Sequence, residues 1–347
     1  MRYALAGTAL LVVAVLIDVR ATGSHVANLV QPGDRGPSAA LFHEDFPNLD
    51  LPGGTGHDGQ QFYAVARSPM HMDEAAEHLD RPHYRLQRPL FPWVAWLLHP
   101  SGGGVGLVAA MFAVGMAAVV LGALGTGALS VTLGGPAWAG AVFPLLPGVY
   151  ASLRIGVGDT LATALVVAAL TLSSRGRHRW ATVAAVAAVL TKEPVLLVLA
   201  GFALWRRDRA GLALAAVPAA VAAAWAVVVR LVVDAGGRQV REVTWPFAGL
   251  ADAAGNWVDG RELWALLALV VAVGSGALAL VRCGLRSPLG PAITIHLAVL
   301  PLFHADVIGL DLNATRTVLP LTVLATVAVL TSIPAASSSR TDPLPAR

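Results

Sequence analysis

Residues 56–99 read GHDGQQFYAVARSPMHMDEAAEHLDRPHYRLQRPLFPWVAWLLH, the longest polar, aromatic and basic stretch in an otherwise apolar chain. One apolar segment ends near Val19, before this stretch, and the next begins near Gly104. A loop of this length between two hydrophobic segments usually carries function. The stretch therefore indicates both how the chain is organised and where its chemistry is expected.

The composition is that of a membrane protein. Of the 347 residues, 56% are hydrophobic and 13% are charged, and the mean hydropathy is +0.67. These charges are too few to cover a soluble particle of this size, so we predict an all-α polytopic membrane protein. The net charge of +3 comes mostly from arginines at segment ends, which is an orientation signal and implies no nucleic-acid partner. Cys283 is the single cysteine, which excludes an internal disulfide.

About ten hydrophobic helical segments are expected, at 3–19, 104–126, 136–150, 158–173, 181–191, 194–205, 210–233, 262–282, 289–304 and 315–333. We interpret the first as a retained span and not as a cleaved signal peptide. With the N-terminus inside, the positive-inside rule is met by Arg175, Arg177, Arg179, Arg206, Arg207, Arg209, Arg282 and Arg286. The first loop, about 20–88, then faces outside together with most of the acidic residues.

These features predict one integral domain over residues 1–333 in the inner or plasma membrane, followed by a disordered cytoplasmic tail over 334–347. Residues 89–99 form an expected interfacial or re-entrant helix. The segments at 181–191 and 194–205 are each too short to cross about 30 Å of hydrocarbon, so we expect a re-entrant hairpin over about 181–205. Its tip carries Lys192 and Glu193 at membrane depth, where exposing a charge to lipid costs about 2.5–3.5 kcal/mol.

The loop also carries a resemblance. It resembles the first loop of a bacterial family of polytopic membrane proteins, which reads roughly DGQFYY, a variable spacer and YRYQRILYPLLAW. That family resembles GT-C glycosyltransferases and is more distantly similar to the GPI-anchor mannosyltransferase II type, whose members use a lipid-phosphate sugar donor. The matching residues here are Asp58, Gly59, Gln60, Phe62, Tyr63, Tyr84, Arg85, Gln87, Arg88 and Pro92.

The resemblance implies sugar transfer, which needs a carboxylate to take the acceptor proton and cations to stabilise the departing phosphate. Asp58 is the candidate base, with Gln60 and Tyr63 as a face that holds sugar. The alternative is an Asp-Gly turn in which Asp58 caps a helix. Glu44 and Asp45 form a rival acidic pair, unless they are simply solvated.

Cations for the donor phosphate are expected in two places. Arg85 and Arg88, beside Tyr84, lie just before the interfacial helix and could contact phosphate bidentately, or they could merely snorkel to the headgroups. At the hairpin tip, Lys192 could contact the phosphate, or it could only neutralise acids such as Asp159. The expected donor-binding set is Gln60, Tyr63, Tyr84, Arg85, Arg88, Asp159, Lys192, Glu193 and Arg316.

No metal site is predicted. His71, Glu74 and His78 have a spacing that could present ligands on one helical face, but we favour a solvated helix. A divalent cation, Mg²⁺ or Mn²⁺, stays open as an aid to transfer, and no other cofactor is expected.

The predicted function is that of a membrane glycosyltransferase. It would move mannose or another hexose or pentose from a polyprenyl-phosphate donor to a cell-envelope glycan, lipid or protein on the extracytoplasmic face. The alternatives are a polytopic transporter or lipid flippase, and a non-catalytic accessory protein of envelope glycan assembly. Buried charges such as Lys192 count against the accessory protein, and the lack of matched halves counts against the transporter.

Overall fold

The computed structural model describes residues 2–21, 25–234, 242–260 and 262–332, and over these ranges the protein is all-α. The predicted cytoplasmic tail, 334–347, lies outside them. One isolated antiparallel bridge joins Val243 to Phe303. The α helices are α1 (Arg2–Ala21), α2 (Ala39–Asp45), α3 (Asp58–Arg67), α4 (Met72–Glu77), α5 (Pro82–Leu86), α6 (Leu90–Leu98), α7 (Val105–Thr132), α8 (Pro147–Arg154), α9 (Asp159–Ser174), α10 (His178–Thr191), α11 (Leu196–Arg206), α12 (Arg209–Val232), α13 (Ala248–Val258), α14 (Leu263–Cys283), α15 (Gly290–Val299), α16 (Ala305–Ile308), α17 (Asp311–Thr317) and α18 (Leu319–Thr331). Short 3₁₀ helices are η1 (Val26–Leu29), η2 (Ala137–Ala141), η3 (Phe143–Leu145), η4 (Glu193–Val195) and η5 (Leu300–Leu302).

Three of the described helices, α7, α12 and α14, are long and apolar enough to cross a membrane. A fourth span is obtained if α17 and α18, which meet at a bend of 47°, count as one. The prediction of a helical membrane protein is confirmed at this level, but the prediction of about ten hydrophobic segments is wrong as a number of spans. Several apolar runs fold into helices shorter than the hydrocarbon thickness.

Proline explains much of this shortening, because a proline within an apolar run ends or bends a helix. The run at 136–150 contains Pro144 and Pro147 and forms two 3₁₀ helices and the start of α8. In the run at 289–304, α15 stops at Val299, directly before η5 with Pro301. The break between α17 and α18 falls just before Pro320.

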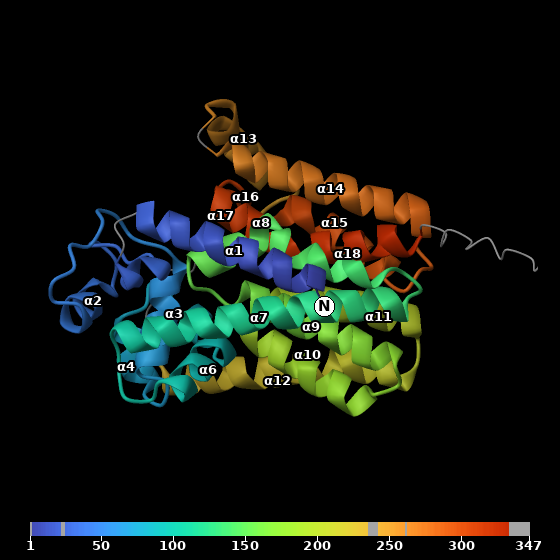
Figure 1. The fold of residues 1–347 in the computed structure, drawn as a ribbon. Coiled ribbons are helices and arrows are strands. Elements are labelled where there is room, and N and C mark those ends of the chain that lie inside the picture. Colours follow the sequence, from blue (N-terminus) through green and yellow to red (C-terminus); the bar gives the residue numbers. More distant parts are fainter. Residues whose placement is uncertain (1, 22–24, 235–241, 261, 333–347) are drawn as a thin grey trace, which may run out of the picture.

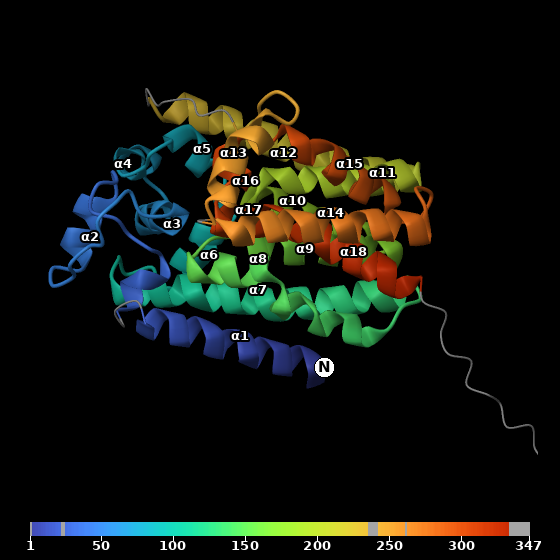
Figure 2. The same cartoon turned by 90° about the horizontal axis from the view of Figure 1, so that it is seen from above.

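The helices form a bundle (Figure 1), and its two ends differ in the residues that they carry. At one end α2, α3 and α4 gather beside the beginnings of α7 and α9. The other end carries the C-termini of α7, α9 and α11, where Arg175 donates to Thr132 Oγ1 over 3.0 Å and Arg206 donates to the Ser173 carbonyl over 2.9 Å. We call these the loop end and the arginine end. Seen from above, α1 and α12 lie on opposite sides of the bundle (Figure 2).

The residues of the expected hairpin form α10, Lys192, η4 and α11, and the tip between the two helices lies at the loop end. Pro194 lies in η4, directly after Lys192 and Glu193 at the tip. Both arms pack against α12, while α10 also packs along α9 and α11 along α15. The two arms are therefore held apart by neighbouring helices, and Lys192 faces the beginning of α9. The predicted interfacial helix at 89–99 is α6, which packs against α3 and α7.

Candidate functional site

Eight charged side chains converge at the loop end and contact one another in pairs. They come from α3, α5, α9, η4 and α17, and from the segments directly before α5, directly after α5 and directly after α10. We call this group the charge cluster; it comprises Asp58, Asp80, Arg85, Arg88, Asp159, Lys192, Glu193 and Arg316. All but Asp80 are candidates from the sequence.

Asp58 is the first residue of α3, and its carboxylate lies between two arginines. Oδ1 is 2.8 Å from Arg85 Nη2, and Oδ2 accepts a hydrogen bond from Arg316 Nη2. Although burial acts against ionisation, Arg316 and Arg85 together hold the pKa of Asp58 well below its ordinary value. The residue that precedes α3 as its N-cap is His57, so Asp58 does not cap the helix.

Gly59 explains how Asp58 reaches this position. A Cβ built on Gly59 would overlap the carbonyl oxygen of Ile155 and lie 2.8 Å from that of Val30. Only a residue without a side chain lets α3 approach these two backbones so closely. The Asp-Gly pair thus places the carboxylate next to the turn that leads into α9.

A second acid, Asp159, is the first residue of α9 and is almost completely buried. Its Oδ1 contacts Lys192 Nζ, and its Oδ2 is 3.7 Å from Arg316 Nη1. Arg316 therefore joins the two acids, and it also donates to Asn313 Oδ1 over 2.6 Å. Of the two roles considered for Lys192, contact with Asp159 is the one that this geometry contains.

The remaining basic residues surround the ring of Tyr84. Arg88 Cζ lies 4.1 Å from the ring centroid and Arg85 Cζ lies 5.4 Å from it, both within cation–π range. Arg88 Nε donates to both oxygens of Glu193, over 2.9 and 3.2 Å. Among the described residues the Tyr84 hydroxyl has no hydrogen-bond partner, and burial raises its pKa.

Sequence reasoning missed two contributors, both beside α5. Asp80 holds Arg85 bidentately, with Nε–Oδ1 and Nη2–Oδ2 distances of 2.9 Å each. Arg81 contacts Glu242 Oε1 over 2.6 Å and lies over Tyr84. A signal for both was present in the sequence. Asp80 and Arg81 stand directly before Pro82, and a proline often marks the first turn of a helix, so both side chains could be expected at the start of α5.

Four other predicted residues lie outside the charge cluster. The Gln60 amide bonds to the backbone of Thr55 and Gly33 and so holds the 31–57 loop. Near the middle of α3, about 7.5 Å from Asp58 by helical rise, the Tyr63 hydroxyl donates to Asp45 over 2.5 Å. Arg67 contacts Asp45 over 3.2 Å and the exposed Glu44 over 3.7 Å. The rival acids thus form a separate group that joins α2 to α3.

The described residues do not fit a divalent cation. They contain no group of three or more His, Cys, Asp or Glu side chains placed to hold a metal. Each acid of the charge cluster already contacts an arginine or a lysine. His71 and Glu74 are exposed and 3.8 Å apart.

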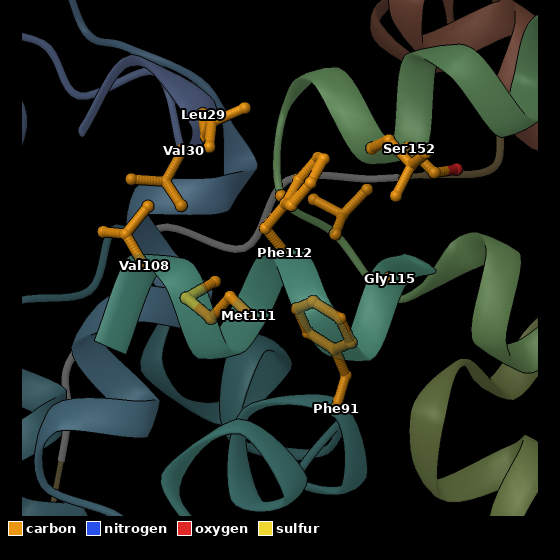
Figure 3. A pocket seen from close by; sticks show the side chains of 11 residues that line it. Leu29, Val30, Phe91, Val108, Met111, Phe112, Gly115 and Ser152 are labelled. Atoms are coloured by element: carbon orange, nitrogen blue, oxygen red, sulfur yellow. The ribbon is translucent and has the colours of Figure 1, made fainter. Parts of the chain in front are cut away.

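Two hollows lie elsewhere. The first, between η1, α6, α7 and α8, is lined by apolar side chains such as Val30, Phe91 and Met111 (Figure 3). Its volume of about 10 Å³ is near that of one water molecule, too small for a substrate. The second is an open cleft of about 540 Å³ at the arginine end, lined by Thr132, Leu133, Ser174, Trp205, Arg206 and Asp208. Neither is lined by a residue of the charge cluster.

Comparison of the chain with known protein families, with curated proteins and with solved structures finds no match. The function is therefore argued from the cluster itself.

Proposed function

We propose that this protein is a membrane glycosyltransferase that uses a polyprenyl-phosphate sugar and has its reacting centre at the charge cluster. The observation that carries the proposal is the convergence of seven sequence-predicted residues at one end of an apolar bundle. Guanidinium and ammonium groups recognise phosphate, and long apolar helices give an isoprenoid chain a lipid environment. By the positive-inside rule, the loop end faces the outside of the cell membrane.

In the reaction, the acceptor hydroxyl attacks the anomeric carbon of the donor sugar. A new carbon–oxygen bond forms on the acceptor, and the bond to the phosphate oxygen breaks with inversion. Asp58 takes the hydroxyl proton, and polyprenyl phosphate leaves with the electron pair. Arg85, Arg88, Lys192 and Arg316 stabilise the charge that grows on the phosphate, which is a large contribution in a site with little water.

The test is sugar transfer by purified protein from a polyprenyl-phosphate sugar to an envelope acceptor. A general base contributes about 10²–10⁴-fold, so Asp58→Asn should lower turnover by that order. Asp45→Asn and Glu44→Gln should cost less, because those acids lie at the far end of α3. Loss of transfer in Asp45→Asn with near-normal transfer in Asp58→Asn would make Asp45 the base.

If wild-type protein transfers no sugar from any polyprenyl-phosphate donor, the glycosyltransferase proposal is wrong. Expression level and melting temperature of each variant are measured alongside, so that loss of fold is not read as loss of chemistry.

A further inference from the structure

The charge cluster is electrically balanced. Its four basic side chains, Arg85, Arg88, Lys192 and Arg316, each contact at least one of its four carboxylates. The neighbouring pair of Arg81 and Glu242 is balanced as well. A phosphate that enters adds negative charge to a largely buried site, where uncompensated charge is costly. We therefore expect the phosphate to displace one of the carboxylates from its arginines. The site then carries one extra negative charge unless a proton is taken up together with the phosphate.

Among the four carboxylates of the charge cluster, Asp58 alone contacts two of its arginines, and both of these partners keep another acid when Asp58 leaves. Arg85 is also held by Asp80, and Arg316 also contacts Asp159. The Asp58 side chain is 23% exposed, less than those of Asp80 and Glu193 but more than that of Asp159, which is 6% exposed. Asp58 can thus move toward water without leaving a buried arginine unpaired.

We propose that a phosphodiester headgroup binds Arg85 and Arg316 in place of Asp58, and that at acidic pH the released Asp58 carboxylate takes up a proton from solvent. This inference rests on the proposed function, since the polyprenyl-phosphate donor is the phosphodiester concerned. It adds that the donor itself frees the base. Without donor, Asp58 is held between two arginines and is a weak base. With donor bound, it is released beside the sugar, and above its raised pKa it is ionised and a stronger base.

The sign of the pH dependence follows from the groups that face Asp58. These are His57 beside it, Arg85 and Tyr84 on α5, and Arg316 on α17. The two arginines now hold the Asp58 pKa low. A phosphate that takes both arginines and adds its own charge raises that pKa. Affinity therefore rises as pH falls through the window between the two pKa values, by about tenfold per pH unit inside it.

Calorimetric titration tests the inference with methyl farnesyl phosphate, a phosphodiester whose single charge does not titrate in the range used. Wild-type protein in detergent is titrated between about pH 4 and pH 7 in two buffers of different ionisation enthalpy, which gives the number of protons bound. We expect uptake approaching one proton near the acidic end. Asp58→Asn should bind with no uptake and with nearly constant affinity, while the exposed control Asp73→Asn should retain the uptake.

Binding of methyl farnesyl phosphate without proton uptake overturns the inference and leaves the transferase proposal standing. Uptake that persists in Asp58→Asn overturns the assignment to Asp58, and failure of the ligand to bind overturns the inference altogether. The wild-type measurement needs no variant to fold. Sugar transfer is assayed on the same preparation, so proton uptake without transfer would instead count against the proposed function.

Discussion

At the scale of single residues, neighbours decide what each polar group can do. Asp58 and Asp45 are both acids of the first loop, yet one contacts two arginines of different elements and the other accepts a hydrogen bond from a tyrosine. The first arrangement presents a carboxylate beside the groups that we propose to bind phosphate. The second joins α2, α3 and the start of α7, since Tyr63 also accepts from the Gly104 backbone.

This difference predicts unequal losses of stability when the hydroxyl groups of Tyr63 and Tyr84 are removed. Tyr63→Phe removes the partner of the Asp45 carboxylate and of the Gly104 amide, and it should cost about 1–3 kcal/mol of stability. Tyr84→Phe should change stability by less than about 0.5 kcal/mol, because its hydroxyl bonds to no described residue. Thermal unfolding in detergent measures both. Equal losses would contradict the assignment.

The close approach at Gly59 can be tested in the same way. Gly59→Ala should destabilise by about 1–3 kcal/mol or more, because the added carbon meets the backbones of Ile155 and Val30. Gly274 on α14 meets no atom within 4 Å, so Gly274→Ala should be neutral or stabilising by up to about 1 kcal/mol. A tolerated Gly59→Ala would show that α3 does not need this contact.

The sequence singled out seven of the eight residues of the charge cluster one by one, but not their pairing. A charge stands out in an apolar chain, so Lys192, Asp159 and Arg316 could be named from the cost of exposing them to lipid. The contact between Asp58 and Arg316 joins positions 258 residues apart and depends on how α3 meets α17. Asp80 was missed because an acid in a polar spacer has the same sequence signal whether it is paired or solvated.

At the scale of elements, hydropathy predicted where apolar segments lie but not how long each helix is. The segments expected at 104–126, 210–233 and 262–282 are the long helices α7, α12 and α14. Elsewhere prolines divide apolar runs, and tertiary packing decides where each piece lies. The apolar runs at 181–191 and 194–205 are each too short for a span, which is why the sequence predicts two short helices there. The helices α10 and α11 have 14 and 11 residues.

The contact between the hairpin tip and α9 predicts strong energetic coupling. Lys192→Met leaves the buried Asp159 without its nearest cation, and Asp159→Asn leaves Lys192 in the same position, so each should cost about 3–5 kcal/mol. The double variant should cost clearly less than both single losses together. Unfolding of the four proteins of the cycle measures the coupling. Strictly additive losses would mean that the two side chains do not interact.

At the scale of the whole molecule, the bundle separates its charges into a balanced cluster at the loop end and a row of arginines at the other. The positive-inside rule then assigns the arginine end to the cytoplasm. The proposed reacting centre on the outer face requires this polarity, because the proposed acceptors belong to the cell envelope.

Cysteine labelling tests that orientation. In a Cys283→Ser background, Asp73→Cys on α4 and Arg177→Cys before α10 are both exposed positions at opposite ends. A maleimide that does not cross membranes should label Asp73→Cys in intact cells and should label Arg177→Cys only after permeabilisation. The reverse pattern, or equal labelling of both in intact cells, would contradict the proposed orientation.

The most direct test of the central claim is the position of the donor phosphate. An electron cryo-microscopy map of the protein with a polyprenyl-phosphate sugar should show phosphate density in contact with Arg85 and Arg316, near Lys192 and Arg88, with the Asp58 side chain turned away from the arginines and toward the sugar. Phosphate density at the arginine end, or a charge cluster that keeps all its ion pairs with donor bound elsewhere, would contradict it.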